Sequence, residues 1–248
     1  MKRIPLAIVM PVYNEEEAVR KVVEDWVGEI RKVVGTGQFV FIALNDGSKD
    51  KTADVLKVCA SQFQEMHLID KPNSGHGQSC ILGYEKASSM GAEWVFQIDS
   101  DGQCDPKFFS SLWSSRHLSN GVFGFRQSRD DGFQRWVISR IVSVFSWVAT
   151  GVWVRDANVP YRLMKSDTLK DVLPFVPKDF HLANILVSLL FENITPIFWV
   201  NIHFRDRTGG SPSVKAYSFF KHGIKLFVQL RQAYRQHLNF FRRSVVPN

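Results

Sequence analysis

Two aspartates separated by one residue form the most informative chemical pattern in the sequence. Asp99 and Asp101 follow the apolar run Trp94–Ile98, and Gln103 comes two residues later. Carboxylate and amide oxygens are the ligands that hard divalent cations prefer, and such cations complete their coordination with water and substrate phosphates. We therefore predict a Mg²⁺ or Mn²⁺ site at Asp99, Asp101 and Gln103. The alternative is a turn rich in aspartate that caps a helix starting at Asp105.

The segments that must hold these carboxylates alternate between short apolar runs and amphipathic stretches. Apolar residues at helical spacing predict helices from about Ala18 to Val34, over Thr52–Phe63 and over 78–89. Four buried strands are expected beside them, at Leu6–Val12, Phe39–Leu44, His67–Asp70 and Trp94–Ile98. This alternation indicates an α/β fold with a doubly wound, mostly parallel sheet in roughly the first 105 residues.

Folds of this class bind their ligands at the carboxyl ends of the parallel strands. Three predicted loops emerge there, at Tyr13–Glu17, Asn45–Lys49 and Asp99–Gln103, and each contains carboxylates. A dinucleotide-dependent oxidoreductase would instead need a Gly-x-Gly-x-x-Gly turn after the first strand, which Pro11–Glu15 does not provide.

The second half of the chain has a less regular pattern. We expect a helix near Trp136–Thr150, a strand over Val159–Met164, a helix around Leu182–Phe191 and a strand over Ile197–Phe204. No linker or internal repeat interrupts these segments, so a single domain with two functional halves is expected.

Composition narrows the class of protein further. The chain has 248 residues, of which 45% are hydrophobic and 22% charged, which excludes a disordered or fibrous protein. Three scattered cysteines are too few for a disulfide framework and are expected to be reduced. The longest uncharged stretch, Ile141–Val154, has 14 residues and is shorter than a membrane span of roughly 18. We therefore expect a cytoplasmic protein, either soluble or peripheral to a membrane.

The net charge of +7 is concentrated at the end of the chain. Eight Lys and Arg residues and no acidic residue follow Asp206, which leaves the rest of the chain close to neutral. From Val214 to Phe241, aromatic and apolar residues recur every three or four positions, which predicts a basic amphipathic helical tail suited to an anionic membrane surface. The alternatives are a helix that packs on the core or forms a homodimer. Nucleic-acid binding is not expected, because the body is not basic and carries no such motif.

Ordered motifs along the chain resemble those of a known enzyme family. Pro11-Val-Tyr-Asn-Glu15, Asn45-Asp-Gly-Ser48 and Asp99-Ser-Asp101 are similar to motifs of the inverting family 2 glycosyltransferases, which have the Rossmann-like GT-A fold. Gly124-Phe-Arg126, Arg135, the segment from Asp156 to Arg162, and Asp206-Arg207-Thr-Gly-Gly210 resemble the polyprenyl-phosphate sugar transferases, the branch similar to dolichol-phosphate mannose synthase. The resemblance covers residues 5 to 215.

The resemblance implies a donor site for a nucleoside-diphosphate sugar, linked to UDP or GDP. Its expected members in this sequence are Pro11, Tyr13, Glu15, Asn45, Asp46, Gly75, Gln78, Asp99 and Ser100. Asp101 would act in catalysis through the metal, which neutralises charge on the leaving diphosphate. Two positions depart from the family: Asn45 stands where an aspartate is usual, and His76 stands where a lysine is often found.

The resemblance also implies an acceptor site in the second half. Arg126, Arg135 and Arg207 would bind the acceptor phosphate, since the arginine fork can hold two oxygens at once. Asp156 and Arg162 flank a segment in which Pro160 replaces the glycine of the family. A phosphate acceptor is already ionised and needs no general base. A sugar hydroxyl would need one, and Asp179 is then the candidate.

The expected function is metal-dependent transfer of a sugar to a polyprenyl phosphate or another lipid-linked acceptor, by a protein bound peripherally at the cytoplasmic face of the membrane. Residues 1–213 would form the catalytic domain, with a nucleotide-sugar half at 1–105 and an acceptor half at 106–213, and residues 214–248 the tail. Two alternatives remain at this point: a soluble family 2 enzyme that uses a sugar hydroxyl, with Asp179 as base, and a nucleotide-sugar-binding module that has lost catalysis.

Overall fold

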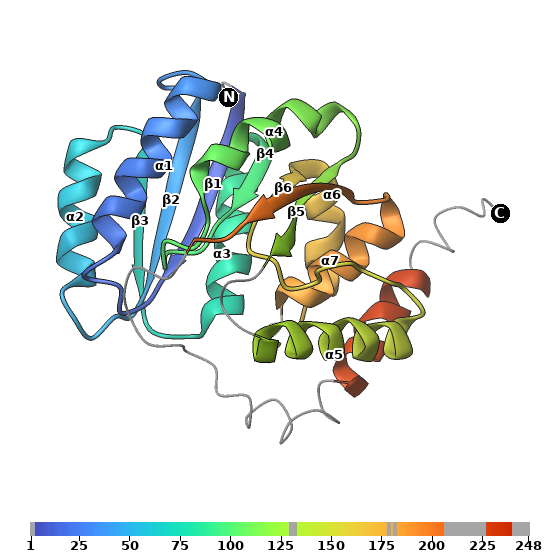
Figure 1. Ribbon diagram of the computed structural model, residues 1–248. Helices are drawn as coiled ribbons and strands as arrows, with labels where there is room; N and C mark the ends of the chain where they lie inside the picture. Colours follow the sequence, from blue (N-terminus) through green and yellow to red (C-terminus); the bar gives the residue numbers. More distant parts are fainter. Residues whose placement is uncertain (1–2, 129–132, 178–179, 181–182, 206–226, 240–248) are drawn as a thin grey trace.

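A seven-stranded sheet runs through the part of the chain that the structure describes. The computed structural model describes residues 3–128, 133–177, 180, 183–205 and 227–239 (Figure 1). The strand order is β3-β2-β1-β4-β6-β5-β7. The strands are β1 (Ile4–Val12), β2 (Phe39–Asp46), β3 (Met66–Lys71), β4 (Ala92–Gln97), β5 (Gly121–Ser128), β6 (Arg162–Lys165) and β7 (Phe198–His203).

One strand, β6, runs against both of its neighbours. It pairs antiparallel with β4 and with β5, whereas β1 pairs parallel with β2 and β4, β2 with β3, and β5 with β7. Two successive reversals cancel, so β5 points in the same direction as β4. The carboxyl ends of β1, β2, β4 and β5 therefore lie at the same edge of the sheet.

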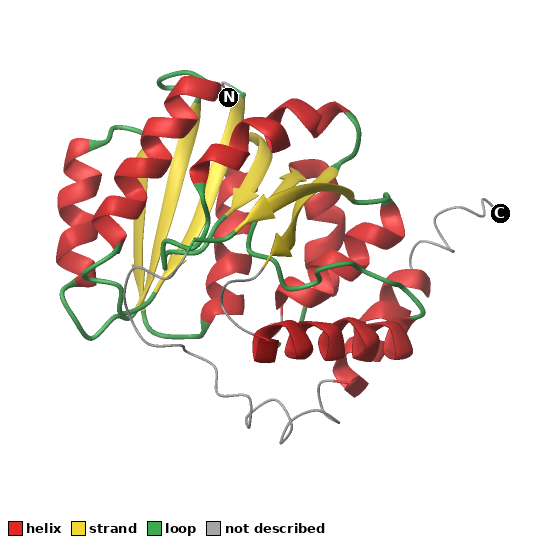
Figure 2. Cartoon of the chain, in the orientation of Figure 1, coloured by secondary structure: helices red, strands yellow, loops and turns green. Residues whose placement is uncertain are grey.

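Helices cover both faces of this sheet, as Figure 2 shows. The helices α1 (Val19–Val33), α2 (Thr52–Gln62) and α4 (Phe109–Ser114) share one face. The other face carries α3 (His76–Ser89), α6 (Ser166–Val172) and α7 (Ala183–Ile194), which contact one another. A longer helix, α5 (Phe133–Thr150), lies along the lower edge of the molecule in Figure 1.

The central strands form because they are almost entirely apolar and both of their faces are buried. In β2 every residue is buried, as expected for a strand inside a parallel sheet. Helix α1 has its buried residues at helical spacing, and its Trp26 ring packs against Phe96, Phe109 and Tyr161. These aromatic contacts join the first and second halves of the chain into one core.

The expected α/β fold with a mostly parallel sheet is confirmed, and the predicted elements of the first half lie within a few residues of their observed bounds. Three elements were not predicted, namely β5, α4 and α6. The strand expected over Val159–Met164 begins later, at Arg162. All three cysteines are free thiols, buried in the core.

The end of the chain is helical at residues 227–239, and its apolar face is buried. Leu230, Ala233 and Tyr234 are buried, and the Tyr234 hydroxyl donates a 2.8 Å hydrogen bond to Asn193 Oδ1 in α7. The Phe227 ring packs against Phe145 of α5, with 5.3 Å between ring centroids. In this described part of the predicted tail, the observed arrangement is therefore packing on the core.

None of the helices in the described residues has the length and apolar character needed to cross a membrane.

Candidate active site

The loops that follow β1 and β2 are tied together by reciprocal hydrogen bonds. Asn14 has a positive φ of 53°, and its backbone N–H donates to Ser48 Oγ while its side-chain oxygen accepts from the Lys49 N–H at 2.8 Å. The Glu15 N–H donates to Thr52 Oγ1. These bonds fix the expected nucleoside loop, with Pro11, Tyr13 and Glu15, beside the second loop. Tyr13 is partly exposed, whereas Glu15 is buried.

The carboxylate of Asp46 holds the loop that leads into α3. It accepts hydrogen bonds from the backbone N–H groups of Ser74 and Gly75 at 2.8 and 2.9 Å, and it forms an ion pair with Lys71 Nζ. The two loops approach closely: a Cβ on Gly47 would lie 2.7 Å from the Asn73 nitrogen. Asp46 thus positions the glycine turn at the edge of the expected donor pocket.

Sequence reasoning missed Lys71, although a signal for it existed. Asp46 ends β2 and Lys71 ends the neighbouring β3, and the two residues are in register. A lysine at the end of one strand, opposite an aspartate at the end of the next, is a pattern that can be recognised once the strand order is known.

Asn45 has a specific partner in the same strand pair. Its side-chain amide donates a 2.8 Å hydrogen bond to Asp70 Oδ1, and its side-chain oxygen accepts from the Ser48 hydroxyl at 2.6 Å. An amide can donate and accept at once, but an ionised carboxylate can only accept. The departure from the family at this position is therefore matched to the carboxylate of Asp70.

The metal candidates lie directly after β4, at the carboxyl edge of the sheet. Asp101 accepts a 3.1 Å hydrogen bond from the Gln103 N–H, and Ser100 and Gln103 are largely buried. Asp99 Oδ1 is buried and accepts no hydrogen bond from the described residues. Burial raises the pKa of Asp99 to about 6, and the nearby Asp101 carboxylate adds to the rise while His76 opposes it.

His76 begins α3 and lies beside Asp99. Its Nε2 lies 3.7 Å from Asp99 Oδ1, 3.5 Å from Cys80 Sγ and 3.4 Å from Asn184 Nδ2. Burial lowers the pKa of His76, but Cys80 and Asp99 raise it by more, so the net shift is upward. The imidazole therefore places positive charge beside Asp99. Gly75 and Gln78, two other donor candidates, lie in the same turn and first helical turn.

The donor set at this edge fits a hard divalent cation. Asp99 and Asp101 would supply carboxylate oxygens, and Gln103 would add an amide oxygen. Asp99 Oδ1 is buried and has no hydrogen-bond donor among the residues that the structure describes. The described residues contain no group of three or more His, Cys, Asp or Glu placed to hold a metal. Two carboxylates suffice where the substrate diphosphate supplies the remaining ligands, which is the usual arrangement for Mg²⁺.

On the acceptor side, two predicted residues form one ion pair. Arg126, in β5, donates through Nε and Nη2 to the two carboxylate oxygens of Asp156, at 2.6 Å each. Both side chains are mostly buried. The Arg126 guanidinium also packs over the ring of Phe204. The next residue, Arg205, donates its backbone N–H to the carbonyl of Gln103. The end of β7 is thereby attached to the loop of Asp101.

Arg162, predicted on the acceptor side, has a structural part in the fold. Its side chain is fully buried, and it donates hydrogen bonds to the backbone carbonyls of Val159, Ala157 and Asn184, at 2.5 to 2.7 Å. These bonds hold the chain before β6 against the start of α7. A role of Arg162 in acceptor binding stays a prediction.

Three other predicted residues lie in or beside segments outside the described side chains. Arg207 and Asp179 lie outside the described residues, as does most of the predicted tail. Arg135 lies on the first turn of α5, of which the structure describes the backbone.

Solved structures and curated sequences are similar to this chain. Among solved structures, glucosyl-3-phosphoglycerate synthase from Mycobacterium tuberculosis, in complex with Mn²⁺, UDP and glucosyl-3-phosphoglycerate, superposes with a TM-score of 0.66 at 18% identity, over 92% of this chain and 79% of that one. The complex of the same protein with phosphoglyceric acid gives the same values. At this identity the likeness shows the fold, which is the GT-A fold.

Two curated relatives carry the same name, undecaprenyl-phosphate 4-deoxy-4-formamido-L-arabinose transferase. The protein from Photorhabdus laumondii is 27% identical over 172 residues, and that from Pseudomonas fluorescens is 28% identical over 180 residues. The matches cover 68% and 70% of this chain but 51% of each relative, so the chain spans about half their length. Residues 7–183, which include every loop described above around β1, β2 and β4, match the family described as Glycosyl transferase family 2, and the chain belongs to that family.

Proposed function

We propose that this protein is a metal-dependent inverting glycosyltransferase that moves a sugar from a UDP- or GDP-sugar to a polyprenyl phosphate or another lipid-linked acceptor. The observation that carries the proposal is the pair Asp99 and Asp101 at the carboxyl end of β4, with one buried carboxylate oxygen that has no donor among the described residues. Family membership and the names of the curated relatives support the same reaction.

The donor end of the reaction uses the loops tied together at the carboxyl edge. Asp99, Asp101 and Gln103 would hold Mg²⁺ or Mn²⁺ together with the diphosphate, and the bound metal would neutralise charge that develops on the leaving diphosphate. Pro11, Tyr13 and Glu15 would line the nucleoside pocket, and Asn45 and Asp46 would contribute to donor binding beside them. The N-terminus of α3, at Gly75, would add the favourable end of the helix dipole for the diphosphate.

The acceptor end would lie beside β5 and the loop that follows α5. Asp156 holds the guanidinium of Arg126 in one orientation through two hydrogen bonds, at the same edge of the sheet as Asp99. A fixed cation at this point would favour an acceptor phosphate, together with Arg135 and Arg207. A phosphate oxygen is already a nucleophile at neutral pH, so transfer to it requires no general base.

The position of the reaction in the cell is part of the proposal. A lipid-linked acceptor lies in a membrane, and a nucleotide sugar is a cytoplasmic metabolite, so the protein would work at the cytoplasmic face as a peripheral protein.

A substrate screen tests the function. Purified protein is incubated with Mn²⁺ or Mg²⁺ and a panel of nucleotide sugars, with and without polyprenyl phosphate in detergent, and released nucleoside diphosphate is measured. We expect release that depends on metal and on polyprenyl phosphate. Release that depends on a glycolipid hydroxyl instead would favour the second acceptor class, with Asp179 as base. Donor binding without release under any condition would favour a module that has lost catalysis.

The site itself is tested by Asp101→Ala, for which we expect metal-dependent turnover to fall by at least about a hundredfold. Asp167→Asn is the matched control, because Asp167 is an exposed carboxylate that pairs with Lys170 on α6. Circular dichroism checks that both variants are folded. Unchanged turnover in Asp101→Ala would contradict the assignment of this loop.

A further inference from the structure

Among the described side chains of helix α5, several large apolar ones are exposed while small polar ones are buried. Ser143 and Ser146 are each 2% exposed, whereas Trp147 and Val148 are 50% and 60% exposed. Val144 and Ile141, about one and two turns earlier on the same outer face, are also exposed. This is the reverse of an ordinary surface helix, whose apolar stripe faces the core.

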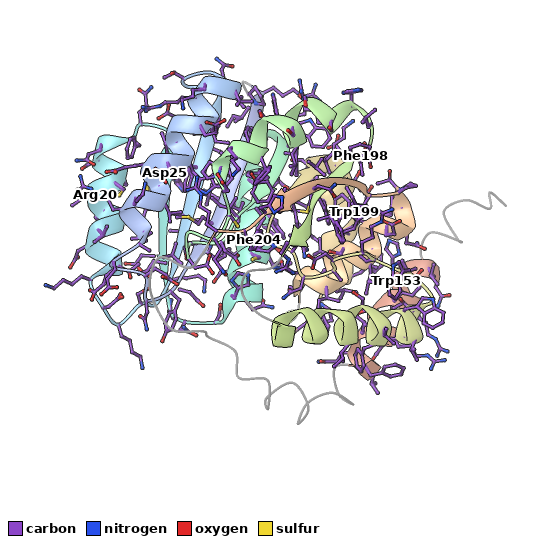
Figure 3. The ribbon with its side chains drawn as sticks, in the orientation of Figure 1. Arg20, Asp25, Trp153, Phe198, Trp199 and Phe204 are labelled. Atoms are coloured by element: carbon purple, nitrogen blue, oxygen red, sulfur yellow. The ribbon has the colours of Figure 1, made fainter. Side chains whose placement is uncertain are left out.

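The exposed surface continues beyond the helix. Trp153, in the loop after α5, is exposed and lies past the carboxyl end of the helix (Figure 3). Val228 is exposed too, and it follows Phe227, whose ring packs against Phe145 of α5. We call Ile141, Val144, Trp147, Val148 and Trp153 the α5 face. Exposed apolar surface of this kind marks a site that a membrane or another molecule covers.

The charges around the α5 face indicate what covers this surface. No charged residue occurs between Arg140 and Arg155, and both ends of this stretch are arginines. Residues 227–239 pack against α5 through Phe227. The outer side of this segment exposes Arg231 and Arg235, and the segment contains no acidic residue. Apolar side chains bordered by arginines, with tryptophans among them, match the boundary between anionic headgroups and acyl chains of a bilayer.

The place of the α5 face in the fold agrees with this partner. Strand β5 points in the same direction as β4, so α5, which follows β5, starts at the edge of the sheet that carries Asp99 and Asp101. The loop after α5 then supplies Asp156, the partner of Arg126. A bilayer in contact with α5 would therefore present lipid headgroups next to the proposed acceptor site.

We propose that the α5 face docks the protein on an anionic bilayer by inserting its apolar side chains at the headgroup–acyl boundary. This proposal rests on the proposed function for the identity of the acceptor, but not for the docking itself. It also moves the attachment point away from the predicted tail. The apolar side of residues 227–239 is buried on the core, and its exposed arginines add charge to the rim of the α5 face.

A fluorescent label on α5 tests the docking directly. The three native cysteines are buried, so Val148→Cys can be labelled selectively with an environment-sensitive dye such as nitrobenzoxadiazole. Val58→Cys is the matched control, since Val58 is an exposed apolar residue of α2, far from α5 in Figure 1. With vesicles of phosphatidylcholine and about one third phosphatidylglycerol, we expect a blue shift and a gain in intensity for the label at 148 and no change for the label at 58.

Binding strength is measured by vesicle co-sedimentation. We expect Val148→Ser to lower the partition coefficient by about tenfold, and Trp147→Ser combined with Val148→Ser by about a hundredfold. Val58→Ser should leave it unchanged. In detergent, where no bilayer has to be reached, transfer to polyprenyl phosphate should be equal in all four proteins. Loss of docking is thereby separated from loss of the proposed function.

Three results would overturn the docking proposal. The first is no response of the label at 148 to vesicles while the protein remains active in detergent. The second is a label already shielded without lipid, together with a dimer in light scattering, because a second copy then covers the α5 face. The third is a label shielded without lipid in a monomer, because another part of the chain then covers the α5 face.

Discussion

The side-chain amide of Asn45 and the carboxylate of Asp70 face each other across the β2–β3 pair, joined by a 2.8 Å hydrogen bond. The two residues are in register, and Asn45 is buried at the end of its strand. A carboxylate at position 45 would therefore meet a second carboxylate at hydrogen-bond distance, with no proton between them above acidic pH.

We expect Asn45→Asp to destabilise the protein by about 1–3 kcal/mol at neutral pH, because it replaces a hydrogen bond with repulsion between like charges. Urea unfolding measures the change. Adding Asp70→Asn should restore most of the stability, since the amide and carboxylate are then exchanged between the two strands. A double variant no more stable than Asn45→Asp would show that Asp70 is not the cause.

The ion pair of Arg126 and Asp156 predicts a cost for removing either charge. Both side chains are mostly buried, and Asp156→Asn would leave the guanidinium without its bidentate partner. We expect a loss of about 2–4 kcal/mol in unfolding free energy and a higher KM for the acceptor. Asp167→Asn, on an exposed pair, should change the unfolding free energy by less than about 0.5 kcal/mol. Equal losses in the two variants would contradict the importance of burial.

Acid stability should depend on Glu65. The Arg31 guanidinium donates two hydrogen bonds to this buried carboxylate and holds its pKa below the ordinary value of 4.5. A carboxyl whose pKa is lower in the folded state stabilises the fold above its unfolded pKa, and this stabilisation is lost as the pH falls through the folded pKa. Between pH 4.5 and 2, unfolding free energy should therefore fall less steeply for Glu65→Gln than for the native protein. An identical slope would exclude Glu65 as a source of acid sensitivity.

The packing of residues 227–239 should weaken at mildly acidic pH. His237 is buried against the Phe175 ring, and burial lowers its pKa from 6.5 to about 4. A released segment binds the proton near pH 6.5, whereas the packed one does not until about pH 4. Docking of this helix therefore weakens by about 1.4 kcal/mol for each pH unit across that window and is unaffected above it.

Hydrogen exchange within residues 227–239, corrected for intrinsic rates, follows this release. His237→Phe keeps a ring against Phe175 and cannot be protonated, so its exchange should be independent of pH between 6.5 and 4. A native protein whose exchange is equally flat would contradict the role of His237.

The first half of the fold could be predicted because its strands are continuous apolar runs that end in polar turns. β5 was missed because Gly121 and Gly124 interrupt that pattern, and Gly124 is there for packing: a Cβ would lie 2.3 Å from Ile202 Cδ1 of β7. This is a contact between strands far apart in the sequence, and no local pattern reports it.

The loops that form the candidate site could be predicted from the sequence, but the pairs of side chains that contact each other could not. Asp99 and Asp101 are where the motif suggested, at the end of β4. The partnership of Asn45 with Asp70 spans 25 residues and that of Arg126 with Asp156 spans 30, so each depends on strand order. Arg162 was assigned to the acceptor because arginines bind phosphate, and burial among carbonyls was not foreseeable from its neighbours in sequence.

The hydrogen bonds of Arg162 link the segment that carries acceptor candidates to the segment that contacts donor candidates. Its guanidinium holds the carbonyl of Ala157, next to Asp156, and that of Asn184, whose side chain contacts His76. A single side chain is therefore hydrogen-bonded both to the loop of Asp156 and to the start of α7, which contacts His76. Movement of these two segments against each other would break hydrogen bonds that are fully buried. A lysine, with its three donors on a single nitrogen, lacks the planar fork that spreads these hydrogen bonds over separate nitrogens.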